Sequence, residues 1–161
     1  MKHTELHIGI NIYEYTELDE ADRRLVDLAC EATERSYSPY SHFRVGAAAR
    51  LADGTVVSGS NQENVAYPSG LCAERTTLFY AGSRYPEQAV DTLAIAARNE
   101  KGQLTEKPTP PCGACRQVML ECEARHRRPM RILLYGQQGI YELKDVESLL
   151  PLSFQADNMK A

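Results

Sequence analysis

Two short segments of the chain begin with cysteines whose spacing could hold a metal ion. "CAER" contains Cys72 and, two residues later, Glu74, whereas "PCGAC" contains Cys112 and Cys115. Residues three apart on a helix are neighbours on one face, so Cys112 and Cys115 can point to one metal. Cys72 could supply a third sulfur. Three thiolates with one open coordination position are the arrangement of a catalytic zinc site.

The two residues that follow Cys72 have chemistry that such a site could use. Glu74 lies on a different helical face from Cys72, so it is a poor ligand but suits proton transfer beside the metal. Zinc with three thiolates carries net negative charge, and Arg75 could offset it by donating hydrogen bonds to the sulfurs. The alternatives are a first-turn glutamate favoured by the helix dipole and an arginine in a surface salt bridge.

Other uses of the cysteines are a structural four-sulfur site and a redox pair. Cys122 follows Cys115 by seven residues, about 10.5 Å along a regular helix, which is far beyond a Zn–S bond of about 2.3 Å. Cys30 lies among apolar helical residues and is expected to be a core cysteine. The fourth position is therefore expected to be left to water. A redox pair would have no use for Cys72 and Glu74 on a separate helix.

The rest of the chain alternates helical and strand patterns, which indicates the α/β class. We expect a three-layer α/β/α sandwich with a mixed central sheet of about five strands, in one domain over residues 1–161. The N-terminal extension, residues 1–15, is expected to form an edge strand, and residues 155–161 are expected to form a tail. Helices are expected over residues 17–36, 72–83, 113–128 and 144–150, the last of them stopped by Pro151. Strands are expected over residues 6–12, 44–51, 55–61, 90–97 and 130–135.

Composition and charge narrow the function classes. The 161 residues carry a net charge of -4, and the sequence pI is near 5.6. This balance argues against a nucleic-acid partner, which usually demands clustered Lys and Arg, and favours a small-molecule substrate. No signal peptide or membrane-spanning run is visible, so we expect a cytoplasmic protein without a membrane partner. Five cysteines without an export signal are expected to be reduced.

Four motifs stand in order along residues 37–154: "SPYSHFRVGAA", "GSNQENVAYPSGLCAERT", "PCGACRQVM" and "LLPLSF". In them the chain resembles the cytidine deaminases of free nucleoside metabolism, in their homotetrameric three-cysteine zinc form. The resemblance implies that Cys72, Cys112 and Cys115 bind zinc and that Glu74 transfers the proton. The implied reaction is hydrolytic deamination of cytidine and 2'-deoxycytidine to uridine and 2'-deoxyuridine with release of ammonia, a step of pyrimidine salvage.

The same resemblance implies roles for further residues. Asn61 and Glu63 would hold the ribose, Phe43 and the backbone of Ala73 would contact the pyrimidine, and Arg75 would hydrogen-bond the zinc thiolates. In the homotetramer, Tyr67 and Phe154 would complete a neighbouring subunit's site. Two alternatives stay open: a deaminase of another cytosine nucleoside such as blasticidin S, and a non-catalytic zinc-stabilised interaction domain.

Overall fold

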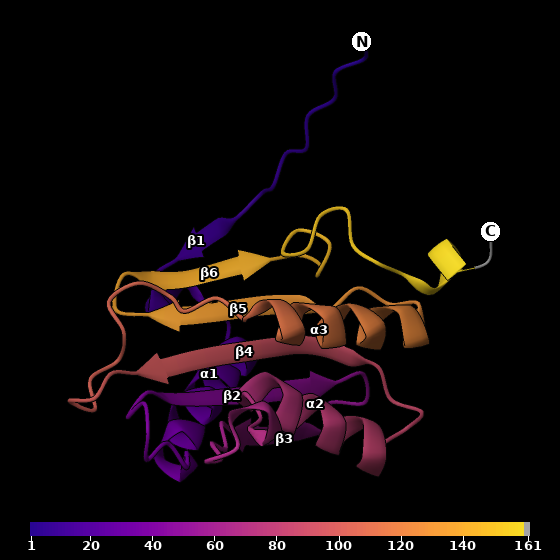
Figure 1. Cartoon of the computed structure of the whole chain (residues 1–161). Coiled ribbons are helices and arrows are strands. Elements are labelled where there is room, and N and C mark those ends of the chain that lie inside the picture. The colour runs from indigo at the N-terminus through magenta and orange to yellow at the C-terminus, as the bar shows by residue number, and fades with distance from the viewer. Residues whose placement is uncertain (160–161) are drawn as a thin grey trace.

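One mixed sheet forms the centre of the protein in the computed structural model, which describes residues 1–159. Within these residues six strands lie in the order β1-β6-β5-β4-β2-β3 (Figure 1). Only β4 and β5 are parallel neighbours, and the other pairs are antiparallel. The strands are β1 (Asn11–Tyr13), β2 (Arg44–Leu51), β3 (Val56–Ser60), β4 (Val90–Arg98), β5 (Arg131–Gly136) and β6 (Gly139–Leu143).

Three α-helices cover the two faces of this sheet. α1 (Glu20–Ala32) packs on one face, and α2 (Ala73–Arg84) and α3 (Gly113–His126) pack on the other. The helix α1 starts at Asp19, whose side chain accepts a hydrogen bond from the backbone N–H of Asp22. This arrangement confirms the predicted α/β/α sandwich. None of the helices described is long and apolar enough to cross a membrane.

Small residues in β2 let the helices approach the sheet closely. Ala47 and Ala49 are fully buried on the α2 and α3 side, and Ala48 is fully buried on the α1 side. At Gly46 a Cβ atom would lie only 2.0 Å from the carbonyl oxygen of Ala29 in α1. The spacing between α1 and the sheet therefore depends on a glycine at this position.

The directions of β3 and β4 decide where α2 and α3 begin. Both strands are antiparallel to β2, so they run in the same direction, and their C-terminal ends lie on the same side of the sheet. The segment after β3 leads into α2, and the segment after β4 leads into α3. The N-termini of these two helices consequently lie on the side of the sheet where β3 and β4 end, although they are forty residues apart in the sequence.

The structure corrects three predictions made for the ends of the chain. The N-terminal strand covers only Asn11–Tyr13, at the sheet edge, and the residues before it run away from the sheet (Figure 1). The helix expected over 144–150 is wrong, because residues 144–151 form bends and turns in which the Asp145 side chain accepts from the Ser148 backbone. The sheet gains a sixth strand, β6, which forms a hairpin with β5. Residues 160–161 of the expected tail lie outside the described residues.

Candidate metal centre and substrate cavity

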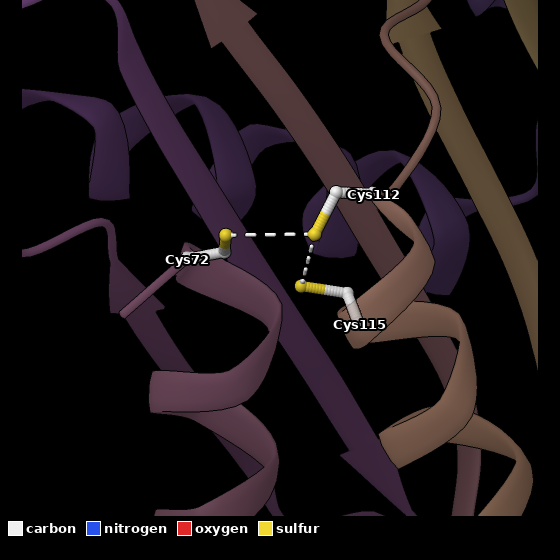
Figure 2. A group of neighbouring side chains, drawn as sticks. All are labelled: Cys72, Cys112 and Cys115. Atoms are coloured by element: carbon white, nitrogen blue, oxygen red, sulfur yellow. Dashed lines mark hydrogen bonds between the residues drawn. The ribbon is translucent and has the colours of Figure 1, made fainter. Parts of the chain in front are cut away.

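Two helix N-termini bring three cysteines together. Cys72 is the N-cap residue of α2, Cys112 is the N-cap residue of α3, and Cys115 lies in the first turn of α3. The Sγ atoms of Cys72 and Cys112 are 3.8 Å apart, and those of Cys112 and Cys115 are 3.5 Å apart (Figure 2). Neither N-cap side chain caps its own helix. The positive ends of both helix dipoles therefore face the sulfurs and stabilise thiolates.

The geometry of the three sulfurs fits a zinc ion. Thiolates placed tetrahedrally at a Zn–S distance of about 2.3 Å are ~3.8 Å apart, and all three sulfurs here lie within 4.8 Å of one another. In the part of the chain that the structure describes, no other group of three His, Cys, Asp or Glu side chains places its ligand atoms this close. Cys30 and Cys122 stay outside the cluster, and burial raises the pKa of each to about 11.

Hydrogen bonds distribute charge unequally among the sulfurs. The pKa of Cys72 is lowered to about 5, first by the hydrogen bond with the Cys115 thiol and then by Arg75 and Cys112, although burial opposes the shift. The pKa of Cys115 is raised by that same hydrogen bond and by burial. Nη2 of Arg75 lies 3.8 Å from the Cys72 sulfur and 3.4 Å from the Gly70 carbonyl oxygen. The guanidinium of Arg75 is thus directed at the cysteine cluster.

Glu74 is a buried carboxyl group beside the cysteines. Its exposed fraction is 4%, and it lines the main cavity together with Cys72 and Cys112. Burial raises the pKa of Glu74, and the nearby charge of Cys72 adds to the effect. A positioned carboxyl group with a raised pKa holds a proton more readily than an ordinary carboxyl group, so it suits a role in which a proton is accepted and then returned.

The cavity has a volume of about 610 Å³ and opens beside the sulfurs, within the range of small-molecule sites. Its lining includes five residues named from the sequence: Phe43, Asn61, Glu63, Tyr67 and Arg75. Tyr67 is 76% exposed and meets the Tyr40 ring edge-on, at 6.0 Å between centroids. The structure therefore gathers most of the predicted site residues around one hollow.

Three predicted residues do not line this cavity: Ala73, Cys115 and Phe154. Ala73 is the first residue of α2, and its side chain is fully buried in the core. Phe154 is 62% exposed, and its carbonyl oxygen accepts a hydrogen bond from Nε2 of Gln117 on α3. Its ring is therefore outside the cavity of its own chain.

Most of the hydrogen-bonding capacity of the Asn61 side chain is used by contacts within the protein. Its Oδ1 accepts hydrogen bonds from the Ser36 hydroxyl at 2.6 Å and from the Val45 backbone at 2.7 Å. Its Nδ2 donates to the Phe43 carbonyl oxygen at 2.9 Å. An amide nitrogen has two hydrogens, so one N–H of Asn61 is left for a ligand.

Glu63 holds the loop that precedes β2. Its Oε2 accepts from the backbone N–H groups of Tyr40 at 2.9 Å and Ser41 at 3.3 Å, and its Oε1 accepts from the Ser41 hydroxyl. The hydrogen bond from Ser41 is the main cause of the lowered pKa of Glu63. A carboxylate has about four acceptor sites, so about one remains for a ligand.

Sequence reasoning did not single out Ser36, Ser41 or Arg116. Arg116 donates from Nε to the Pro111 carbonyl oxygen at 2.9 Å and from Nη1 to the Leu149 carbonyl oxygen at 2.6 Å, and so braces the turn before Cys112. Both serines lie within or just before the motif "SPYSHF". The partners that connect these serines to the predicted site are Asn61 for Ser36 and Glu63 for Ser41. Both partners are more than twenty positions away in the sequence, so no local pattern could have identified these contacts.

Comparisons with known proteins agree with this site. A family model described as "Cytidine and deoxycytidylate deaminase zinc-binding region" matches residues 19–128. A cytidine deaminase of Halalkalibacterium halodurans is 44% identical over 136 residues, which are 84% of this chain and 95% of the relative. One from Sporosarcina psychrophila is 39% identical over 137 residues, covering 84% of this chain and 93% of that protein.

Solved structures show the same similarity. The crystal structure of cytidine deaminase from Burkholderia pseudomallei superposes with a TM-score of 0.70 at 37% identity, covering 81% of this chain and 97% of that one. The enzyme from Mycobacterium tuberculosis gives a TM-score of 0.66 at 34% identity, covering 85% and 99%. Both likenesses extend over nearly the whole of the relatives.

Proposed function

Because the chain belongs to the cytidine deaminase family, we propose that it deaminates both cytidine and 2'-deoxycytidine by hydrolysis and that Glu74 transfers the protons. Cytidine deaminase activity itself is the common property of relatives that match most of the chain. One observation carries the proposed mechanism: a buried carboxyl group, Glu74, lies beside three clustered thiols in a cavity of about 610 Å³.

In the proposed mechanism the protons pass through the Glu74 carboxylate. A zinc ion held by Cys72, Cys112 and Cys115 would act as the Lewis acid that makes a water molecule a stronger acid. The Glu74 carboxylate accepts a proton from the attacking water and passes it to the pyrimidine ring nitrogen. A second transfer protonates the leaving amino group. The C4–O bond forms and the C4–N bond breaks, so water and cytidine give uridine and ammonia.

Arg75 keeps the thiolates at low proton affinity in this proposal. Its guanidinium lies 3.8 Å from the Cys72 sulfur and lowers the pKa of that thiol. The two helix N-termini act in the same direction. Together they offset part of the negative charge that three thiolates would place around a divalent ion.

The substrate is proposed to be a nucleoside and not a nucleotide. Among the described residues that line the cavity, Arg75 is the only cation, and its guanidinium is directed at Cys72 and Gly70. Glu63 and Glu74 contribute negative charge instead. The remaining N–H of Asn61 and the remaining acceptor site of Glu63 suit a sugar hydroxyl, which is both an acceptor and a donor. Phe43 is proposed to pack against the pyrimidine, with the Ala73 backbone beside it.

The assembly is proposed to be a homotetramer in which Tyr67 and Phe154 complete a neighbouring subunit's site. The high exposure of both rings supports this proposal, because large aromatic side chains are usually buried in contacts. Sedimentation of the purified protein would measure the mass of the assembly. The reduced cysteines that the site requires support a cytoplasmic location and a role in pyrimidine salvage.

A nucleoside panel tests the function directly. Purified protein is incubated with cytidine, 2'-deoxycytidine, deoxycytidylate and blasticidin S, and the loss of cytosine absorbance is followed. We expect turnover of the two plain nucleosides alone. The Glu74→Gln variant should keep zinc and fold while turnover falls by about 10²- to 10⁴-fold, the usual contribution of general acid–base catalysis. Absence of turnover with both plain nucleosides, or an unimpaired Glu74→Gln variant, would contradict the proposal.

A further inference from the structure

The loop before β2 connects two proposed substrate contacts through one hydroxyl group. The Ser41 hydroxyl donates a hydrogen bond to Oε1 of Glu63, and its oxygen accepts one from the backbone N–H of Phe43 at 3.0 Å. Glu63 is the proposed sugar contact and Phe43 the proposed base contact. One side chain therefore joins the two ends of the cavity.

The Ser41 hydroxyl also closes a turn in the backbone between Ser41 and Phe43. His42 has a φ of 55°, in the left-handed region that most side chains avoid. A serine hydroxyl that accepts from the N–H two residues later forms a turn that stabilises such a backbone. The N–H of His42 bonds the Ser38 carbonyl oxygen at 3.0 Å and closes the same loop. Phe43 thus takes its place at the end of a turn that Ser41 holds.

The rest of the loop is anchored separately. Asn61 bonds Ser36, Phe43 and Val45 through its amide, and these contacts do not involve Ser41. Oε2 of Glu63 accepts from the backbone N–H groups of Tyr40 and Ser41, and neither of these bonds involves the Ser41 hydroxyl. Loss of that hydroxyl should therefore leave β2 and its attachment intact. What changes is the orientation of the Glu63 carboxylate relative to Phe43.

We propose that Ser41 is a positioning residue that couples Glu63 to Phe43, so that the sugar end and the base end of the cavity are set together. The proposal rests on the proposed nucleoside function of this cavity. Ser41 acts through its two partners and not on the reacting atoms. Its removal should weaken substrate binding more than it slows the chemical step.

The test compares Ser41→Ala with Ser41→Thr, which keeps a hydroxyl, and with Ser83→Ala, an exposed serine at the end of α2 outside the cavity. KM and kcat are measured with cytidine and with 2',3'-dideoxycytidine, which lacks the hydroxyls that Glu63 would hold. We expect Ser41→Ala to raise KM for cytidine by about tenfold or more, the value of a hydrogen bond to a charged group, with little change in kcat. The rise should be clearly smaller with 2',3'-dideoxycytidine.

A double-mutant cycle separates positioning from general loss of structure. In a Glu63→Ala background, the further change Ser41→Ala should add little to KM, because the partner is already gone. Ser41→Thr, which keeps a hydroxyl, should have a KM close to that of the wild type, and so should Ser83→Ala. An equal rise in KM on both substrates, an additive cycle, or a loss confined to kcat would overturn the proposal. A wild-type protein inactive on cytidine would instead contradict the proposed function.

Discussion

Cys72 and Cys112 occupy helix N-cap positions at which serine, threonine or aspartate would ordinarily accept a backbone hydrogen bond. Neither cysteine caps its helix, and their sulfurs turn toward each other. The free N–H groups at both helix starts then stabilise negative sulfur. A poor capping residue is thus useful at this place, because the sulfur is available to a metal.

At the residue scale, Cys112→Ala should lose zinc and activity together. It removes the sulfur that lies within hydrogen-bonding distance of both other cysteines. Loss of a group that hydrogen-bonds a metal ligand lowers activity by up to about 100-fold. Loss of a proposed ligand itself should therefore lower activity by more. Elemental analysis of the purified protein and turnover of cytidine measure the two effects.

Cys122→Ala is the matched control for this change. Cys122 lies on the same helix, is half-buried against the core and has a pKa raised by burial. We expect its removal to leave zinc content and turnover unchanged. Stoichiometric zinc in the purified Cys112→Ala protein would show that the ligands are assigned wrongly.

At the scale of elements, the close contact between α1 and β2 sets the frame on which the loop before β2 is held. Gly46 follows that loop by three residues and lies directly under the backbone of α1. β2 also lies between β3 and β4 and pairs with both of them. A shift of α1 away from β2 would therefore reach both walls of the cavity.

Gly46→Ala should destabilise the protein. The new Cβ atom would meet the Ala29 carbonyl oxygen at 2.0 Å, and overpacking of this kind costs about 1–3 kcal/mol. Gly82→Ala in α2 is the control, because its Cβ atom would meet only the Arg125 side chain at 3.6 Å. That change should be neutral or stabilising, by up to about 1 kcal/mol. Urea unfolding measures both, and equal stability of the two variants would contradict the packing argument.

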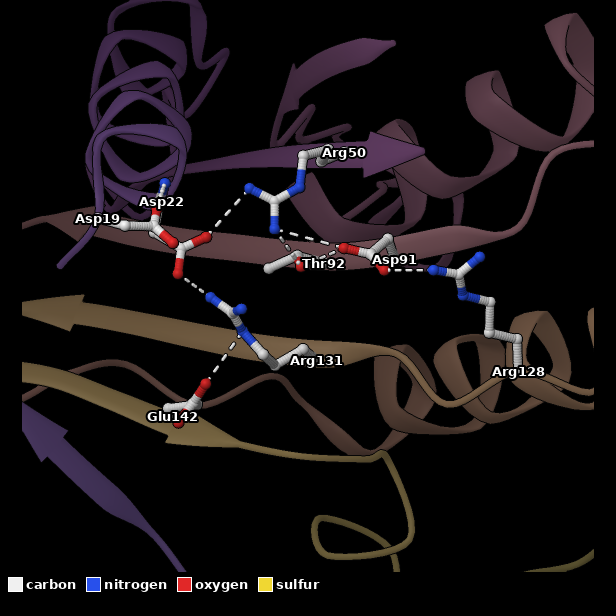
Figure 3. A network of polar contacts seen from close by, with 8 residues as sticks. All are labelled: Asp19, Asp22, Arg50, Asp91, Thr92, Arg128, Arg131 and Glu142. Carbon is white, nitrogen blue, oxygen red and sulfur yellow. Dashed lines mark hydrogen bonds and ion pairs between the residues drawn. The ribbon is translucent and has the colours of Figure 1, made fainter. Parts of the chain in front are cut away.

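At the scale of the whole molecule, a network of charges ties the layers together on the side of the sheet that α1 covers (Figure 3). Asp22 of α1 is nearly buried and bonds Arg50 of β2 at 3.0 Å and Arg131 of β5. Arg50 continues to Asp91 at 3.3 Å, and Asp91 accepts from Arg128 at 2.7 Å. Arg131 also pairs with Glu142 of β6 at 3.0 Å. The network therefore joins α1 to β2, β4, β5 and β6 and to the segment just after α3.

Asp91 makes the stability of this network depend on pH. Burial opposes ionisation, but hydrogen bonds from Thr92, Arg50 and Arg128 prevail, and the pKa of Asp91 is lowered. A lowered pKa in the folded state means that the stabilisation is present above the unfolded pKa of about 3.9. This stabilisation is lost as the pH falls through the pKa that Asp91 has in the folded protein, which is lower than its unfolded pKa.

Asp91→Asn should accordingly lower the free energy of unfolding by about 1 kcal/mol at pH 7, as expected for a partly exposed ion pair. The difference in free energy of unfolding between this variant and the wild type should shrink as the pH falls below about 3.9. Glu87→Gln, at an exposed position outside the network, should show no such pH dependence. Urea unfolding at several pH values measures all three proteins. A difference between wild type and Asp91→Asn that is constant with pH would contradict the assignment.

The sequence by itself determined the features that arise within one helical turn or one short motif. The helical starts at Cys72 and Cys112, the pairing of Cys112 with Cys115 and the place of Glu74 follow from local spacing. The three α-helices and most strands were also predictable, because their apolar periodicity is local. The hairpin strand β6 was missed, and the helix expected after it was wrong, since side-chain bonds to turns override propensity there.

Only the tertiary structure decided how distant segments meet. Cys72 joins the other two cysteines because β3 and β4 run in the same direction, which follows from their common partner β2. The side chains of Asn61 and Glu63 are largely taken up in holding the loop before β2, and Ser41 links that loop to Glu63. Such contacts join residues about twenty positions apart, so their geometry depends on strand pairing and loop closure and not on local sequence.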